Sequence, residues 1–214
     1  LVIIATASNV RCQATIQLLN KFTVKTIIFE KILFNKPDDY SKIHKLLKSN
    51  NIDAYVNCPM RMMSFYKDIK TSFEGSTFKY IVSGSQYGLV TNLIHYLDHI
   101  SYLNLNSEYT CNTNFMDKEL IESKRKGFYD LNGTFQANFK NGTQGFINCE
   151  SKGNSPVIIQ AFNDKVHFIS RESEGKVLIA RAEHGWEWEE IEFEIPFQSQ
   201  LTTILVEDIL SKNS

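Results

Sequence analysis

Residues 26–33, TIIFEKIL, decide the fold of this chain. The apolar, β-branched run is typical of a strand covered on both faces, as strands of parallel sheets are. It is interrupted by Glu30 and Lys31, at the place where the strand would end. Open α/β sheets bind ligands in the crevice beyond their strand ends, and a partly desolvated lysine there can polarise or protonate a substrate oxygen. The alternative interpretation is an ordinary ion pair at a strand end.

The composition is that of an ordinary globular chain. Of the 214 residues, 43% are hydrophobic and 22% are charged, and the net charge is −1. No charged block favours nucleic acid or a membrane surface as a partner, and no apolar run approaches the ~18 residues of a membrane span. The four cysteines are scattered without metal-ligand spacing, which favours reduced thiols in a cytoplasmic protein.

The first residues predict a chain whose beginning is missing. Residues 1–7 already look like a buried strand, although the chain does not begin with Met. No basic segment precedes this apolar run and no cleavage-like site follows it, so a signal peptide is not expected. We therefore expect a fragment of a longer protein.

The order of elements predicts an α/β chain: the second half of a Rossmann-like parallel sheet, followed by an α+β domain with a large open antiparallel sheet. Strands at residues 1–7, 26–33 and 52–57 alternate with helices at residues 10–21 and from residue 37, a spacing that implies right-handed parallel crossovers. Helices at residues 62–73 and 89–103 flank a strand at residues 78–83. From residue 127 onward, strands separated by turn signals form a meander, and residues 201–211 form a closing helix. We expect domains at residues 1–74 and 75–214.

The helix at residues 89–103 carries a polar stripe. Thr91, Asn92, His95, Asp98 and His99 fall within an arc of roughly 120° at helical spacing. A histidine beside a carboxylate three residues away can act as a general acid or base near neutral pH. One alternative is a solvated face. Another is a zinc site, because His95 and His99 have the i, i+4 spacing of helical ligands, but there is no HExxH pattern and we expect no metal.

Arg61 and the two tryptophans allow two interpretations each. Arg61, just past a strand end, suits an anionic or polyol group on a substrate, or an interdomain ion pair. Trp186 and Trp188 alternate on one side of a strand, which favours packing in a core or an oligomer interface over substrate stacking.

Four motifs in order carry a resemblance to a known family. VIIAT (residues 2–6), IIFEK (27–31), VNxPxR (56–61) and NxIHYLD (92–98), followed by an antiparallel meander, resemble the Gfo/Idh/MocA family of NAD(P)-dependent oxidoreductases. The resemblance runs along nearly the whole chain. It implies a Rossmann domain joined to an α/β substrate domain whose sheet commonly makes the oligomer interface, so we expect a homo-oligomer.

The resemblance implies a role for each matching residue. Lys31 matches the lysine of the family's EKP motif, His95 its active-site histidine and Asp98 the aspartate three residues later, so we expect these three residues to be catalytic. The expected substrate-binding residues are Arg61, Asn92 and Thr91. The expected cofactor-binding residues, which would hold NAD or NADP, are Ala5, Thr6, Ser8, Asn9, Glu30 and Lys31.

Several positions depart from the family pattern. Ile32 stands where the motif has Pro, Ala7 replaces a proline, Arg11 replaces a common His, and Thr91 stands where many members have a catalytic Asp. No GxGxxG occurs in the sequence, so we expect the fragment alone to be inactive. The EK-aliphatic form with an NxIHYxD helix resembles a branch associated with bacterial surface-sugar and nonulosonate pathways.

These observations predict an oxidoreductase that transfers a hydride between a nicotinamide and an alcohol or carbonyl group of a sugar-like small molecule. His95 would move the hydroxyl proton, Asp98 would orient His95, and Lys31 would hydrogen-bond the reacting oxygen. Thr91 in place of Asp favours an alternative from another class, a non-catalytic sugar-binding or assembly protein on the same fold.

Overall fold

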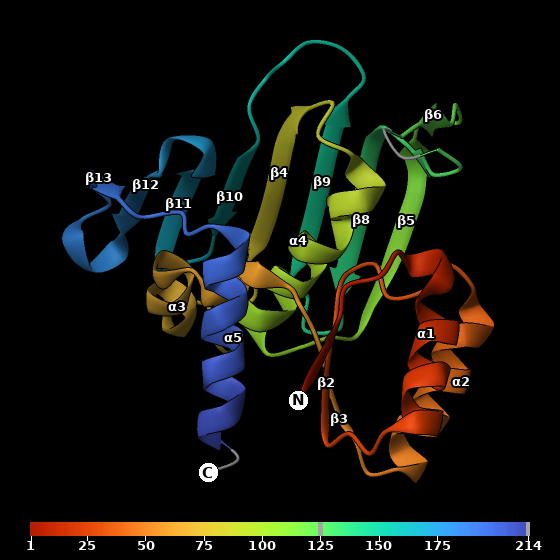
Figure 1. The fold of residues 1–214 in the computed structure, drawn as a ribbon. Coiled ribbons are helices and arrows are strands. Elements are labelled where there is room, and N and C mark those ends of the chain that lie inside the picture. Colours follow the sequence, from red (N-terminus) through yellow and green to blue (C-terminus); the bar gives the residue numbers. More distant parts are fainter. Residues whose placement is uncertain (124–125, 213–214) are drawn as a thin grey trace. The chain divides into compact units, whose positions relative to one another are not determined.

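The structure is a computed structural model that describes residues 1–123 and 126–212 (Figure 1). The chain forms two compact units, Leu1–Cys58 and Pro59–Ser214. No helix among these residues combines the length and apolar content that crossing a lipid bilayer requires.

The first unit is a three-stranded parallel sheet with two helices. Its strands are β1 (Val2–Ile4), β2 (Thr26–Phe29) and β3 (Asp53–Val56), in the order β1-β2-β3, and its helices are α1 (Ser8–Lys21) and α2 (Pro37–Ser49). Strand β2 lies between the other two and is buried along its whole length, as the apolar run predicted. It ends at Phe29, earlier than the predicted end at residue 33, so Glu30 and Lys31 lie in the turn that follows.

The second unit begins before the domain boundary expected from the sequence. Residues 59–74 hold the 3-10 helices η1 (Pro59–Met62) and η2 (Lys70–Ser72) and the short helix α3 (Ser64–Ile69), where one helix at residues 62–73 was predicted. Phe65, Tyr66 and Phe73 from this segment are buried in the core of the second unit. The segment therefore packs as part of the second unit, which contains the large sheet.

The large sheet has eight strands in the order β13-β12-β11-β10-β4-β9-β8-β5. The strands are β4 (Lys79–Ser85), β5 (Tyr109–Met116), β8 (Gly133–Phe139), β9 (Gln144–Glu150), β10 (Ile158–Phe162), β11 (Val166–Arg171), β12 (Lys176–Arg181) and β13 (Trp188–Glu192). All neighbours are antiparallel except β4 and β9, which pair in parallel at the centre. The sequence analysis did not predict β5, and it did not predict that β4 lies inside the large sheet beside β9.

The remaining elements of the second unit are short or lie outside the large sheet. Helix α4 (Leu89–Asn104) follows β4, and helix α5 (Gln198–Lys212) closes the described chain. The two-stranded pair β6 (Ile121–Glu122) and β7 (Tyr129–Asp130) lies between β5 and β8 in the sequence. The turns before β12 and β13 contain η3 (Glu172–Glu174) and η4 (Ala182–His184).

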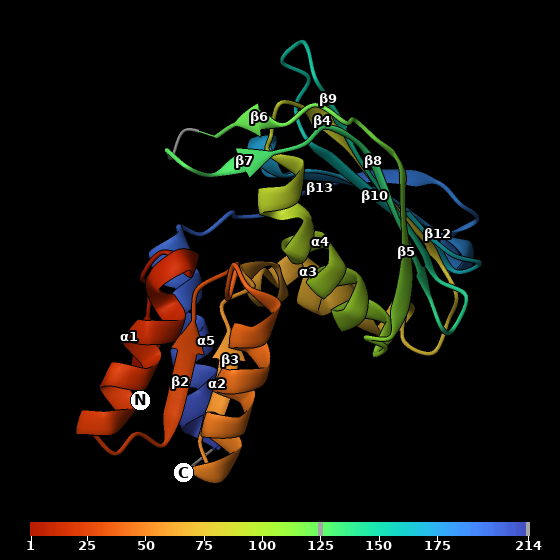
Figure 2. The same cartoon turned by 90° about the vertical axis from the view of Figure 1, so that its right-hand side faces the viewer.

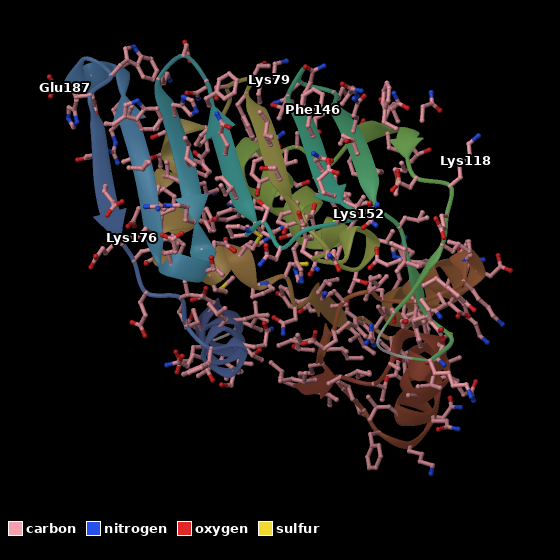
Figure 3. All side chains as sticks on the ribbon, turned by 90° about the horizontal axis from the view of Figure 1, so that it is seen from above. Lys79, Lys118, Phe146, Lys152, Lys176 and Glu187 are labelled. Atoms are coloured by element: carbon pink, nitrogen blue, oxygen red, sulfur yellow. The ribbon has the colours of Figure 1, made fainter. Side chains whose placement is uncertain are left out.

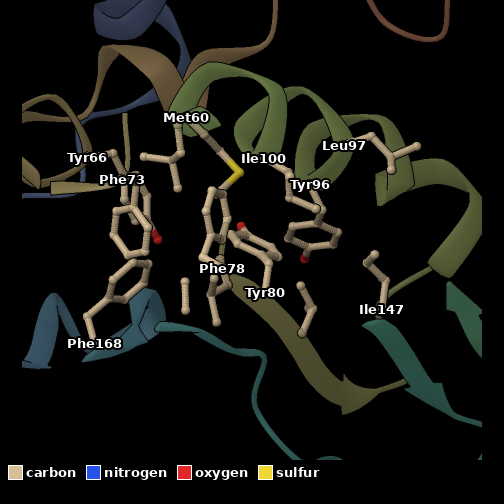
Figure 4. Packing of buried hydrophobic residues seen from close by; sticks show 14 of the residues in the cluster. Met60, Tyr66, Phe73, Phe78, Tyr80, Tyr96, Leu97, Ile100, Ile147 and Phe168 are labelled. Carbon is tan, nitrogen blue, oxygen red and sulfur yellow. The ribbon is translucent and has the colours of Figure 1, made fainter. Parts of the chain in front are cut away.

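Helix α4 covers one face of the large sheet, and an aromatic core lies between them (Figures 2 and 4). Tyr66, Phe78, Tyr80 and Phe168 are all buried in this layer. The helix packs closely on the sheet at Gly145 in β9, because a Cβ there would lie 2.7 Å from Cδ1 of Ile100. A side chain at position 145 would therefore require the end of the Ile100 side chain to move.

The other face of the sheet is open and carries side chains from many strands (Figure 3), among them Lys79 on β4, Phe146 on β9 and Lys176 on β12. Trp188 lies on β13 and is 50% exposed, whereas Trp186 precedes the strand in a left-handed conformation. The two tryptophans therefore do not share a strand, and neither is buried in a core. All four cysteines are free thiols.

Candidate functional site

The turn after β2 presents the Glu30–Lys31 dipeptide at the carboxyl edge of the small sheet. The Glu30 carboxylate accepts a hydrogen bond from Nδ2 of Asn57 at 2.6 Å, and Asn57 follows β3 at the same edge. Lys31 is half-buried, and its peptide bond to Ile32 is cis. The structure thus places Glu30 and Lys31 where the sequence predicted, at the end of the central parallel strand.

The expected cofactor residues of the β1–α1 connection lie at the same edge, because parallel strands end together. Ala5 and Thr6 follow β1 and are exposed, and Ser8 and Asn9 are the first residues of α1. Ala7 caps this helix without a side-chain hydrogen bond. The amides of the first turn therefore point out of the helix start, as a bound polar ligand would require.

Arg11 is the residue of this edge that sequence reasoning did not select. Its side chain is buried, and its guanidinium donates hydrogen bonds to the carbonyl oxygens of Thr6, Glu30, Ile32 and Leu33. One feature of the sequence could have identified Arg11. It is an arginine close to the start of a helix that packs on a sheet, which is an unusual place for a cation without an acidic partner nearby in the sequence.

In the second unit, Thr91 lies at the start of α4 and is held by an acidic residue from β7. The Thr91 hydroxyl donates to Oδ2 of Asp130 at 2.8 Å, and the backbone amide of Val90 donates to Oδ1 at 2.8 Å. Asp130 therefore caps α4 from a distant part of the chain. The left-handed Gly88 before the helix allows this, because a Cβ there would lie 3.0 Å from Oδ2 of Asp130.

A cavity of about 550 Å³ opens beside this helix start. Asn92 lines it and donates from Nδ2 to the carbonyl oxygens of Tyr87 at 2.6 Å and Gly88 at 3.1 Å. Most of the residues that line it have polar side chains, with Gln86, Tyr87, Thr91, Asn92, Glu122, Ser123, Asp130 and Asn132 among them. Two residues that the sequence predicted to bind substrate, Thr91 and Asn92, thus share one cavity.

Arg61 and Asp98, which the sequence assigned to separate tasks, form one ion pair. Nε of Arg61 donates to Oδ2 of Asp98 at 2.6 Å, and Nη2 donates to Oδ1. The guanidinium also lies 5.5 Å from the centre of the Tyr102 ring. Both carboxylate oxygens of Asp98 are therefore engaged by Arg61, in the bidentate geometry that arginine favours.

His95 and His99 are one turn apart on α4 but differ in burial. His95 is half-buried, whereas His99 is fully buried with Nδ1 2.8 Å from the Tyr80 hydroxyl and its ring 4.1 Å from that of Tyr66. Burial, and secondly the charge of Arg61, lower the pKa of His99 to about 3, so its imidazole is neutral at pH 7. His99 belongs to the aromatic core and not to an open polar stripe.

Comparison with solved structures gives the class of this fold. A Gfo/Idh/MocA family oxidoreductase from Vibrio cholerae matches with a TM-score of 0.67 at 16% identity, over 98% of this chain and 68% of that chain. Levoglucosan dehydrogenase in complex with NADH matches with a TM-score of 0.70 at 14% identity, over 97% and 68%. The super-repressor mutant of Gal80p from Saccharomyces cerevisiae matches with a TM-score of 0.70 at 14% identity, over 98% and 65%.

These matches show that the chain has the fold of the Gfo/Idh/MocA oxidoreductases and spans about two thirds of the length of each matched chain. No protein-family profile matches the sequence, and no curated protein matches it. The fold expected from the sequence motifs, a parallel half-sheet joined to a large mostly antiparallel sheet, is confirmed.

Proposed function

We propose that this chain is part of an oxidoreductase of the Gfo/Idh/MocA family, which transfers a hydride between NAD or NADP and a hydroxyl-bearing or carbonyl carbon of a sugar-like molecule. The fold it shares with levoglucosan dehydrogenase, solved with NADH, supports the proposal. The motif order along the chain supports it independently.

In the first unit, the residues expected to bind the cofactor lie at the carboxyl edge of the parallel sheet. Ala5 and Thr6 are exposed at the end of β1, Ser8 and Asn9 begin α1, and Glu30 is held in place by Asn57. These residues would hold the cofactor, which would supply or accept the hydride when bound. Lys31 would hydrogen-bond the reacting oxygen and stabilise the charge that develops on it.

The second unit would bind the sugar at the start of α4. Thr91 and Asn92 bring a hydroxyl and an amide group to the lining of the cavity, and such groups suit the hydroxyls of a sugar. His95, one turn further along the helix, would accept or donate the hydroxyl proton. Since Asp98 is bound to Arg61, we assign that pair the task of supporting this helix face.

The observation that carries the proposal is the lysine-bearing turn at the edge of a parallel sheet, in a chain that shares the oxidoreductase fold. Lys31→Ala and His95→Ala in the full-length enzyme are the test, with NADH formation or consumption followed on candidate sugars. Each substitution is expected to lower kcat by at least ~100-fold, since each removes a group that acts in the transition state. Undiminished hydride transfer in both variants would refute the proposal.

A non-catalytic sugar-binding or assembly protein is the second candidate. It is favoured by Thr91 standing where a catalytic Asp is common and by the same fold in a protein described as a repressor mutant, Gal80p. Nicotinamide fluorescence during titration with sugars separates the two candidates. A change in fluorescence on binding, with no redox change at any sugar concentration, would favour the second.

We also propose that the open sheet face joins copies of this chain into a homo-oligomer. Trp188 is half exposed there, and its ring lies 5.0 Å from that of His167, which in turn contacts Phe162. Trp188→Glu would place a charge in the interface, whereas Trp186→Glu, outside the strand, is the control. Sedimentation of both variants tests this, and unchanged association of W188E would contradict it.

A further inference from the structure

Arg11 is a buried cation whose partners are all backbone carbonyl oxygens. Its side chain is 2% exposed, and Nη1 donates to the carbonyls of Glu30, Ile32 and Leu33, the last at 3.1 Å. Nη2 donates to the carbonyl of Thr6. The oxygens lie on two separate connections, one after β1 and one after β2.

An arginine suits this place for a physical reason. Carbonyl groups in a turn have no ladder partner, so each buried one needs a donor from elsewhere. The guanidinium offers five donors in a flat fork, and the carbonyl dipoles stabilise its charge in return. Burial lowers the pKa of Arg11 while the Glu30 carboxylate and Tyr40 raise it, and the group keeps its charge.

The contacts surround the residues expected to meet cofactor and substrate. Glu30 and Ile32, whose carbonyls Arg11 holds, are the residues immediately before and after Lys31. Thr6 belongs to the connection expected to lie along the dinucleotide. The Arg11 side chain therefore holds the backbone on both sides of Lys31 and links this turn to the connection that contains Thr6.

We propose that Arg11 is a positioning residue, which fixes the Lys31 turn against the Thr6 connection so that both present one ligand-binding edge. Its role for Lys31 rests on the proposed function. Its role in ordering the two connections concerns the first unit alone and is measured without any activity.

Amide hydrogen exchange by mass spectrometry on the purified protein tests the ordering role. Arg11→Met removes the charge and the donors, and Arg11→Lys keeps the charge without the fork, so R11K carries the test if R11M does not fold. Lys21→Met, an exposed basic residue of the same helix, is the control. We expect exchange about tenfold faster in peptides covering residues 5–8 and 30–34, with α2 unchanged.

Two results would overturn the ordering role. One is exchange in R11K equal to that of the unaltered protein. The other is faster exchange spread evenly over the first unit, α2 included, because that would make Arg11 a general contributor to stability.

A double-mutant cycle in the full-length enzyme tests the link to Lys31. R11K is expected to lower kcat/KM about 100-fold, since small displacements of a catalytic group have effects of this size. If Arg11 acts through Lys31, adding K31A to R11K causes a much smaller further loss than K31A alone, whereas His95→Ala keeps its full effect in both backgrounds. Independent, multiplicative losses for Arg11 and Lys31 would refute the link. If the unaltered full-length enzyme transfers no hydride, the proposed function fails, and hydrogen exchange decides the ordering role alone.

Discussion

The two halves of helix α4 carry similar polar side chains but use them differently. In the first half, Thr91 and Asn92 bond to the β7 carboxylate and the preceding turn while lining a cavity of about 550 Å³. In the second half, Asp98 is bound by Arg61, and His99 lies inside the aromatic core. Thr91 and Asn92 therefore line a cavity, whereas His99 is enclosed by the core.

This difference shows what helical periodicity can and cannot predict. Spacing gives the residues that share a face, but a wide face can border a cavity at one end and a core at the other. His99 is tolerated in the core because the Tyr80 hydroxyl bonds to its Nδ1. Polar partners from other elements, and not the helix pattern, decide which half is available to a ligand.

The largest expected effect comes from the buried end of the helix. His99→Ala leaves a void and removes the Tyr80 partner, so we expect it to lower the free energy of unfolding by about 3 kcal/mol. Both tryptophans lie in the second unit, so their fluorescence in urea reports on the unit that holds α4. His184→Ala, at an exposed histidine of the same unit, is the control, and an equal loss in both variants would contradict the burial of His99.

The pH dependence of stability tests the burial of His99 in the second half of α4. The folded-state pKa of His99 is about 3, below the ordinary ~6.5, so the unfolded chain binds a proton that the folded chain does not. The contribution of the neutral, buried His99 to stability is therefore complete above pH ~6.5 and is lost as the pH falls towards 3. Between pH 7.5 and pH 5.0, we expect the titration of His99 to lower the free energy of unfolding by about 2 kcal/mol, as measured by urea unfolding.

His99→Gln is the variant that isolates this effect, because it removes the titrating group and keeps a polar side chain. Burial raises the pKa of the Glu172 carboxyl, which changes stability in the opposite direction, but that contribution is common to both proteins. An equally steep loss in H99Q below pH 6.5 would assign the acid sensitivity to other groups.

At the open end of the helix, Asp130→Ala is expected to cost about 1.5 kcal/mol. The substitution leaves the Val90 amide and the Thr91 hydroxyl without their acceptor, which is the loss of a helix cap. Thr91→Val removes one of these bonds and should cost less when both variants are unfolded in urea. A larger loss for T91V than for D130A would show that Asp130 is not the cap.

The smallest effect is expected for Asp98→Asn, at about 0.5 kcal/mol. The Arg61 side chain is 39% exposed, so water and salt screen the pair. The difference from the unaltered protein should vanish in 1 M NaCl. A loss that persists at high salt would mean that the second half of α4 depends on this pair more strongly than its exposure indicates.

The sequence predicted local features of the fold well and distant pairings poorly. The parallel half-sheet was predicted because β2 has a continuous apolar run between helices with clear periodicity. Strand β5, with the sequence YTCNTNFM, was missed because an exposed edge strand rich in Asn and Thr has no apolar alternation. The early start of the second unit was missed because residues 59–74 reveal their partners only in three dimensions.

The candidate site shows the same limit. Glu30, Lys31, Thr91 and Asn92 stand at strand and helix ends that the pattern marks. Asp130 comes from a strand far along the chain and has no motif of its own. Arg11 binds carbonyl oxygens, which every residue has, so its partners leave no trace in the amino-acid sequence.

The parallel pair at the centre of the large sheet has a consequence for synthesis. Both neighbours of β4, namely β9 and β10, are made after it, with α4 and the four strands β5 to β8 between β4 and β9. Such distant pairing is slow because a long loop must close first. On the ribosome, the apolar surfaces of β4 and α4 therefore stay exposed until residue 162 has emerged. During this interval the nascent chain offers its largest apolar surface to a chaperone.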